Sequence, residues 1–108
     1  MEELQTLKEI ELALKESRML MLSLSRPDCP ACRELRPRME TLLASYPRLR
    51  SVFVNVDTVE GARDRFLVEH LPTILLYSSG NETYRAARVS SPEPLAEKIA
   101  LYYRILFG

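Results

Sequence analysis

The chain has 108 residues, which suits one domain and is too short for two ordinary ones. Hydrophobic residues make up 46% and charged residues 28%, with 3 Gly and 7 Pro, which excludes a disordered or collagen-like chain. Lys plus Arg and Asp plus Glu both number 15, so no global basic field attracts nucleic acid or anionic lipid. We therefore expect one domain over residues 1–108, with neither nucleic acid nor a membrane as its partner.

The N-terminal residues predict a helix over residues 2–17. Apolar residues recur there at the spacing of one buried helical stripe, at Leu4, Leu7, Ile10 and Leu14. This start is acidic, whereas a signal peptide would be basic and then apolar. The longest apolar run, Met19 to Leu22, is far shorter than the roughly 18 to 20 residues of a membrane-spanning helix. We expect a cytoplasmic protein.

The rest of the chain predicts four strands and three helices. Residues 19–25 form an apolar run that indicates a buried strand. The elements expected after it are a helix over 30–45, a strand over 52–57, a helix over 59–69, strands over 73–77 and 83–88, and a helix from residue 91 onward. A helical crossover makes the first two strands parallel, and the short turn makes the last two an antiparallel hairpin. This order predicts an α/β sandwich around a four-stranded mixed sheet.

The two cysteines, Cys29 and Cys32, lie where the first predicted strand meets the next helix. Disulfide scaffolds need several pairs, and this pair closes too small a loop to hold a fold together. The positive end of the helix and Arg26 and Arg33 nearby should lower the pKa of Cys29 below its ordinary value, although Asp28 opposes them. Cys32 lies about one turn further on, which suits a two-step thiol–disulfide exchange.

These features together resemble the thioredoxin family. The match spans residues 18–107 and consists of an apolar strand, Cys29-Pro30-Ala31-Cys32, Pro37, Asn55-Val56-Asp57 at a strand end, Leu71-Pro72-Thr73 and Gly80. The resemblance implies a thioredoxin-like three-layer α/β/α sandwich, here with a four-stranded sheet that lacks the family's usual first strand. It also implies a thiol–disulfide oxidoreductase, acting as a protein disulfide reductase in redox homeostasis and electron transport, without a cofactor.

The resemblance further implies a substrate groove beside the sulfur atoms. It assigns a cis peptide bond between Leu71 and Pro72, and a bend that exposes the Leu71 backbone to an extended substrate peptide. The residues expected to act are Cys29 as nucleophile, Cys32 as resolving cysteine, and Pro30, Ala31, Leu71, Pro72 and Thr73 as the substrate-binding set. The implied partners of this monomer are disulfide-containing proteins and a reductase or small thiol that recycles the dithiol.

Three positions depart from the family pattern. Asp28 stands where thioredoxins have a tryptophan, and the chain has no Trp. Ser23 stands where they have a buried aspartate that handles protons for the second cysteine, and Arg88 lies near where they have a glycine beside the groove. These departures favour one alternative, a protein-interaction or redox-sensing module with little turnover.

A metal site is the other alternative, because Cys-x-x-Cys pairs also bind zinc. Structural zinc needs four ligands, and only His70 could join the two thiols. We expect no metal site within one chain, which leaves a site shared between two chains as the alternative. His70 is expected to be a polar residue at a helix end, with proton donation to the sulfur atoms as its alternative role.

Overall fold

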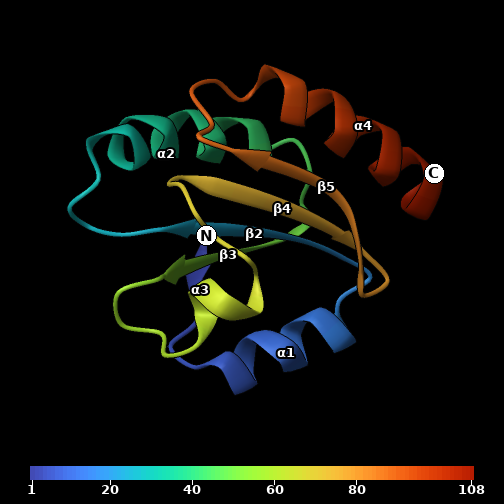
Figure 1. Ribbon diagram of the computed structural model, residues 1–108. Helices are drawn as coiled ribbons and strands as arrows, with labels where there is room; N and C mark the ends of the chain where they lie inside the picture. Colours follow the sequence, from blue (N-terminus) through green and yellow to red (C-terminus); the bar gives the residue numbers. More distant parts are fainter.

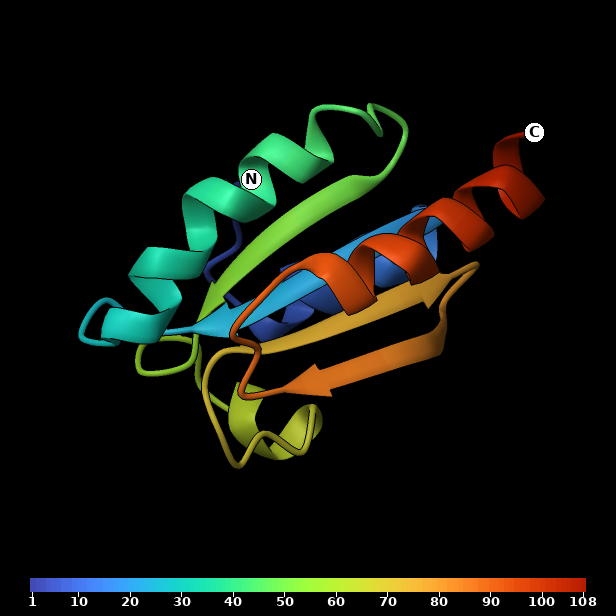
Figure 2. The ribbon, with the colours of Figure 1, turned by 90° about the horizontal axis from the view of Figure 1, so that it is seen from above.

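In the computed structural model, which describes residues 1–108, one mixed sheet lies between two layers of helices (Figure 1). The elements run in the order β1 (Glu2–Glu3), α1 (Leu7–Glu16), β2 (Met19–Ser25), α2 (Pro30–Leu43), β3 (Arg50–Asn55), α3 (Ala62–Arg65), β4 (Thr73–Ser78), β5 (Asn81–Ala87) and α4 (Glu93–Phe107). Helices α1 and α3 cover one face of the sheet, while α2 and α4 cover the other (Figure 2). None of the helices combines the length and the apolar character that crossing a bilayer requires.

The sheet has the strand order β1-β3-β2-β4-β5, with β2 at its centre. Strand β2 pairs parallel with β3, and antiparallel with β4 on its other side. Leu24 near the end of β2 therefore lies opposite Thr73 at the start of β4. This change of direction brings the segment after β2, which holds both cysteines, to the same edge of the sheet as the segment before β4.

Two hydrophobic cores fill the space on either side of the sheet. Every residue of β2 is buried, which explains its unbroken apolar sequence. The core toward α1 and α3 includes Ile10, Leu22, Val54, Phe66, Val68 and Leu75. The core toward α2 and α4 includes Met21, Leu35, Met39, Ile74, Leu95 and Ile99.

The four-stranded sheet expected from the sequence is wrong, because the structure has a fifth strand at the N-terminus. Glu2 and Glu3 of β1 pair parallel with Val52 and Phe53 of β3, and the Leu4 N–H donates to the Phe53 carbonyl at 3.2 Å. Both glutamates are exposed, so β1 has none of the apolar alternation that identifies a strand in a sequence. The N-terminal strand usual in the family is thus present and very short.

The first helix accordingly begins later than expected, at Leu7. Thr6 and Glu9 form a capping box, in which the Thr6 hydroxyl accepts from the Glu9 N–H at 3.1 Å and the Glu9 carboxylate accepts from the Thr6 N–H at 3.0 Å. This arrangement satisfies N–H groups that the helix itself leaves free. Leu4, expected in the helical stripe, precedes the helix and still packs against the first core.

The helix expected over 59–69 is reduced to the single turn of α3. Its N-cap is Gly61, which has a φ of 84°, a left-handed conformation that glycine adopts without steric cost. Asp57 does not cap the helix, because the helix begins after Gly61 and the Asp57 carboxylate forms an ion pair with Arg63 at 3.6 Å. Residues 66–72, after α3, therefore form a loop that leads to the start of β4.

Candidate functional site

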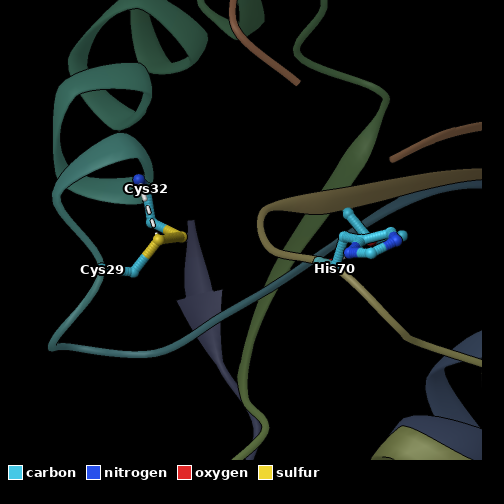
Figure 3. Close-up of a disulfide and its surroundings, with 4 residues drawn as sticks. Cys29, Cys32 and His70 are labelled. Carbon is cyan, nitrogen blue, oxygen red and sulfur yellow. Dashed lines mark hydrogen bonds between the residues drawn. A yellow bond between two sulfur atoms is a disulfide. The ribbon is translucent and has the colours of Figure 1, made fainter. Parts of the chain in front are cut away.

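Cys29 and Cys32 form a disulfide at the first turn of α2 (Figure 3). Their Cα atoms are 5.2 Å apart, and each residue is 8% exposed. Cys29 is the N-cap of the helix, and its Sγ accepts a hydrogen bond from the Cys32 N–H at 3.2 Å. Pro30 occupies the first turn, where its missing N–H leaves no helical bond unmade. The pair therefore lies at the helix start that the sequence predicted.

Cys29 lines an open groove of about 740 Å³. One wall is the start of α2, with Pro30 and Ala31, and the other is the loop before β4, with Leu71 and Pro72. These four residues were predicted to bind substrate, and the topology of β2 and β4 brings them together. Cys29 and these four residues therefore line one open groove.

Thr73, the fifth residue predicted to bind substrate, does not line this groove. It is 2% exposed, and its hydroxyl donates to the His70 carbonyl at 2.6 Å. The bond closes a short ring around Leu71 and Pro72, so Thr73 acts on the groove by holding the loop before β4 in place.

The peptide bond between Leu71 and Pro72 is cis, as the resemblance implied. Leu71 is half-buried, and neither its N–H nor its carbonyl makes a hydrogen bond within the chain. The neighbouring Pro72 carbonyl accepts from the Val89 N–H at 3.2 Å, which continues the pairing of β4 with β5. The groove wall therefore presents one unpaired backbone donor and acceptor, the groups through which an extended peptide adds to a sheet.

Cys32 lies on the other side of the disulfide, against a separate small cavity of about 80 Å³. The hydroxyl-bearing residues Ser23 and Ser25 line it with Cys32, and both are buried. No carboxylate lines this cavity. The departure at Ser23 therefore leaves Cys32 beside a cavity lined by hydroxyl groups and by Arg26, Arg33 and Arg36, where thioredoxins have an acid.

Arg88, which follows β5, contacts His70, which lies in the loop before β4. The Arg88 Nη2 lies 3.0 Å from Nδ1 and 3.1 Å from Nε2 of the His70 ring. Arg88 lies near where thioredoxins have a glycine, and its φ of 54° is in the left-handed region that glycine adopts easily. The contact with His70 was not predicted, because the two residues are 18 positions apart and lie in separate loops.

A second arginine ties the end of α3 to β5. The Arg85 Nη1 donates to the Phe66 carbonyl at 2.8 Å, and two Arg85 nitrogens bind the Glu82 carboxylate at 3.0 Å each. The hydrogen bond from Arg85 lowers the pKa of Glu82 below its ordinary value, and the carboxylate raises the pKa of Arg85. This exposed pair was also missed in the sequence, and it fixes the beginning of the loop that ends at Pro72.

The charged residues that line the groove are of both signs. The basic ones are Arg26, Arg63 and Arg88, and the acidic ones are Asp28, Glu34 and Glu69. Arg63 forms an ion pair with Asp57 at 3.6 Å, whereas neither Arg26 nor Arg88 forms an ion pair within the chain. The mouth of the groove is therefore polar and locally charged, although the chain as a whole is neutral.

Comparison with known proteins places this site in a wider group. The sequence model of the family described as Thioredoxin matches residues 4–100. Thioredoxin-like protein YdfQ of Bacillus subtilis is 32% identical over 105 residues, 97% of this chain and 94% of that protein. Thioredoxin of Chlamydia pneumoniae is 31% identical over 71 residues, 66% of this chain and 70% of that protein.

Solved structures agree with this grouping. Oxidized mitochondrial thioredoxin 3 of Saccharomyces cerevisiae superimposes with a TM-score of 0.86 at 23% identity, covering 93% of each chain. Thioredoxin from Trypanosoma brucei brucei gives a TM-score of 0.88 at 17% identity, covering 94% of this chain and 89% of that one. At these identities the two structures show a shared fold.

Proposed function

The chain belongs to the thioredoxin family, and from this premise we propose that it is a thiol–disulfide oxidoreductase that reduces disulfides in proteins. One observation above all supports the proposal. The Cys29–Cys32 disulfide lies at a helix N-terminus, and Cys29 lines a groove whose facing wall presents the unpaired backbone of Leu71. A reactive sulfur and a means of holding an extended peptide thus occur side by side.

We assign the attacking role to Cys29 and the resolving role to Cys32. Cys29 lines the groove, whereas Cys32 lines the small cavity behind it. The Cys32 N–H that points at the Cys29 Sγ, together with the helix dipole, stabilises negative charge on that sulfur. A substrate in the groove therefore meets a sulfur on which negative charge is stabilised.

The exchange takes two steps. The Cys29 thiolate attacks one sulfur of the substrate disulfide, that disulfide breaks, and the departing substrate thiolate takes up a proton. Cys32 then loses its proton and attacks the Cys29 Sγ, which breaks the mixed disulfide and releases the second substrate thiol. Two electrons pass from Cys29 and Cys32 to the substrate, one proton comes from the Cys32 thiol and one from water, and the Cys29–Cys32 disulfide forms.

The groove residues hold the substrate during this exchange. The peptide pairs with the Leu71 N–H and carbonyl as an added strand, while Pro30, Ala31 and Pro72 contact its side chains. Thr73 does not contact the peptide, and it contributes to binding by holding Leu71 and Pro72 in position through its bond to the His70 carbonyl. The backbone pairing is independent of sequence, which suits a protein that acts on several substrates.

The partners follow from the chemistry. Disulfide-containing proteins are the substrates, and a reductase or a small thiol must return two electrons to the disulfide after each cycle. We place the exchange in the cytoplasm, where such pairs are kept reduced, and we expect the chain to act as a monomer.

The test is the reduction of insulin disulfides by dithiothreitol, followed as the turbidity of the freed chains. The wild-type protein should accelerate the reaction, and Cys29→Ala should abolish the acceleration. Absence of any rate above background, or full activity in Cys29→Ala, would contradict the proposal.

A trapping experiment tests the two cysteine roles. Cys32→Ser should hold substrates as long-lived mixed disulfides through Cys29, and these should dissolve on addition of excess thiol. The double variant Cys29→Ser/Cys32→Ser is the matched control and should trap nothing. Trapping that requires Cys32 in place of Cys29 would mean that the roles are reversed.

A second function, a protein-interaction or redox-sensing module with little turnover, is favoured by the cavity beside Cys32. Its residues Ser23 and Ser25 supply no carboxylate to take the Cys32 proton, which could slow the resolving step. Such a module would form the mixed disulfide in the wild-type protein and release it slowly. Accumulation of mixed disulfide in wild-type protein during insulin reduction would support this second function.

A further inference from the structure

The backbone at Arg88 has an unusual conformation for an arginine. Its φ of 54° falls in the left-handed region, which glycine adopts freely and other residues seldom adopt. Such conformations in residues other than glycine persist where surrounding structure enforces them, and they cluster at functional sites. A glycine would meet the backbone requirement here more easily, so the arginine side chain calls for an explanation.

Arg88 is exposed at the groove. The residue lines the groove that contains Cys29, and its guanidinium lies against the ring of His70, which lines the same groove as Leu71. It forms no ion pair, in contrast to Arg63 on the same groove, which pairs with Asp57 at 3.6 Å. Arg88 therefore presents a positive charge that no carboxylate of the chain neutralises at ion-pair distance.

The position of this charge relates it to a bound peptide. A peptide that pairs with the Leu71 backbone runs along the wall where Arg88 and His70 lie. Alternate side chains of an extended peptide point to the same side, so a residue two positions from the reacting cysteine is directed like that cysteine. A carboxylate on such a residue could reach Arg88.

We propose that Arg88 is a specificity-determining residue, which selects disulfide substrates that carry an aspartate or glutamate close in sequence to the reacting cysteine. The inference rests on the proposed function and adds a substrate class to it. The acidic residues of the groove limit where the carboxylate can sit, because Asp28 and Glu34 belong to the α2 side and repel it there. Glu69, next to His70, also lines the groove, and its negative charge repels a substrate carboxylate. The preference for an acidic residue should therefore depend on where that residue stands in the peptide.

The experiment uses short peptides that each carry one cysteine in a disulfide with a chromogenic thiol. An aspartate, an asparagine or a lysine is placed two residues before or two residues after the cysteine. The reduced wild-type protein should react with the better aspartate peptide roughly two- to fivefold faster than with the lysine peptide, the range expected for one exposed ion pair. Rates with dithiothreitol alone on the same peptides correct for the effect of charge on the disulfide itself.

Variants of Arg88 separate charge from backbone conformation. Arg88→Gln and Arg88→Gly should bring the corrected aspartate-to-lysine ratio close to one, whereas Arg88→Lys should keep most of it. Arg88→Gly suits a positive φ, so it should fold even if Arg88→Gln does not. Arg104→Gln is the matched control, because it removes one exposed, unpaired arginine of α4 that lies outside the groove.

The possible outcomes distinguish this inference from the function on which it rests. Equal corrected rates for the three peptides at both positions, or a ratio that Arg88→Gly leaves unchanged, would overturn the role of Arg88. A ratio that Arg104→Gln reduces as much as Arg88→Gln does would assign the preference to overall charge and would overturn it as well. Failure of the wild-type protein to react with any peptide would instead count against the proposed function.

Discussion

The hydroxyl of Thr73 should matter for turnover as well as for the stability of the fold. Thr73 is buried at the start of β4, and its bond to the His70 carbonyl spans Leu71 and Pro72. Thr73→Val keeps the branched shape and removes the hydroxyl, whereas Thr73→Ser keeps the hydroxyl and removes a methyl group. The two variants therefore separate the hydrogen bond from the packing.

The magnitudes follow from burial and from the lost bond. Loss of one hydrogen bond lowers the free energy of unfolding by about 0.5–1.5 kcal/mol, and this bond is partly buried, so we expect about 1 kcal/mol for Thr73→Val. Thr73→Ser loses one buried methyl group, which costs about 0.8 kcal/mol. The variants should be similar in stability and should differ in whether the loop before β4 is held.

Turnover should distinguish them. The reaction of Thr73→Val should require about 1 kcal/mol of additional free energy to hold the loop before β4 in its reactive position. This cost lowers kcat/KM for insulin reduction about fivefold. Thr73→Ser should stay within about twofold of wild type. The measurements are denaturant unfolding of the oxidised protein and the initial rate of insulin reduction. Equal turnover in the two variants would refute the positioning role of the hydroxyl.

Two further predictions concern ionisation. In reduced Cys32→Ser protein, the ultraviolet absorbance of the Cys29 thiolate should titrate with a pKa below the ordinary cysteine value, because the N-terminus of α2 stabilises the anion; an unshifted titration would argue against activation by the helix. The lowered pKa of Glu82 means that its carboxylate stabilises the fold at neutral pH, a contribution lost as the pH falls below the ordinary value of 4.5 and through the lowered pKa. Glu82→Gln should thus lower the free energy of unfolding by less than about 1 kcal/mol at neutral pH, since the pair with Arg85 is partly exposed; a deficit that persists unchanged in strong acid would contradict this.

Elements with two buried faces or a well-marked motif could be predicted from the sequence. Strand β2 was predicted with its observed bounds, Met19–Ser25, because burial on both faces leaves an unbroken apolar run. The helix start at Cys29 and the cis bond before Pro72 also agree with what motif and resemblance implied. Strong local patterns therefore defined the sulfur site and the wall that faces it.

Features that depend on exposed residues or distant contacts could not be predicted in the same way. Strand β1 consists of two exposed glutamates, and only its pairing with β3 makes it a strand. Helix α3 is short because Gly61 before it and Leu67 after it take left-handed conformations that periodicity does not reveal. The contact of Arg88 with His70 joins two loops whose proximity follows from the fold alone.

The two walls of the groove pack against different hydrophobic cores, one on each face of the sheet. The wall formed by α2 rests on the core that contains Leu35 and Met39, while the loop before β4 packs through Val68 and Leu71 onto the core on the opposite face. The sheet separates these cores, so a change of packing in one should shift one wall and leave the other in place. Substitutions beneath the loop could therefore retune which partners are accepted without altering the electron-transfer chemistry of the sulfur pair.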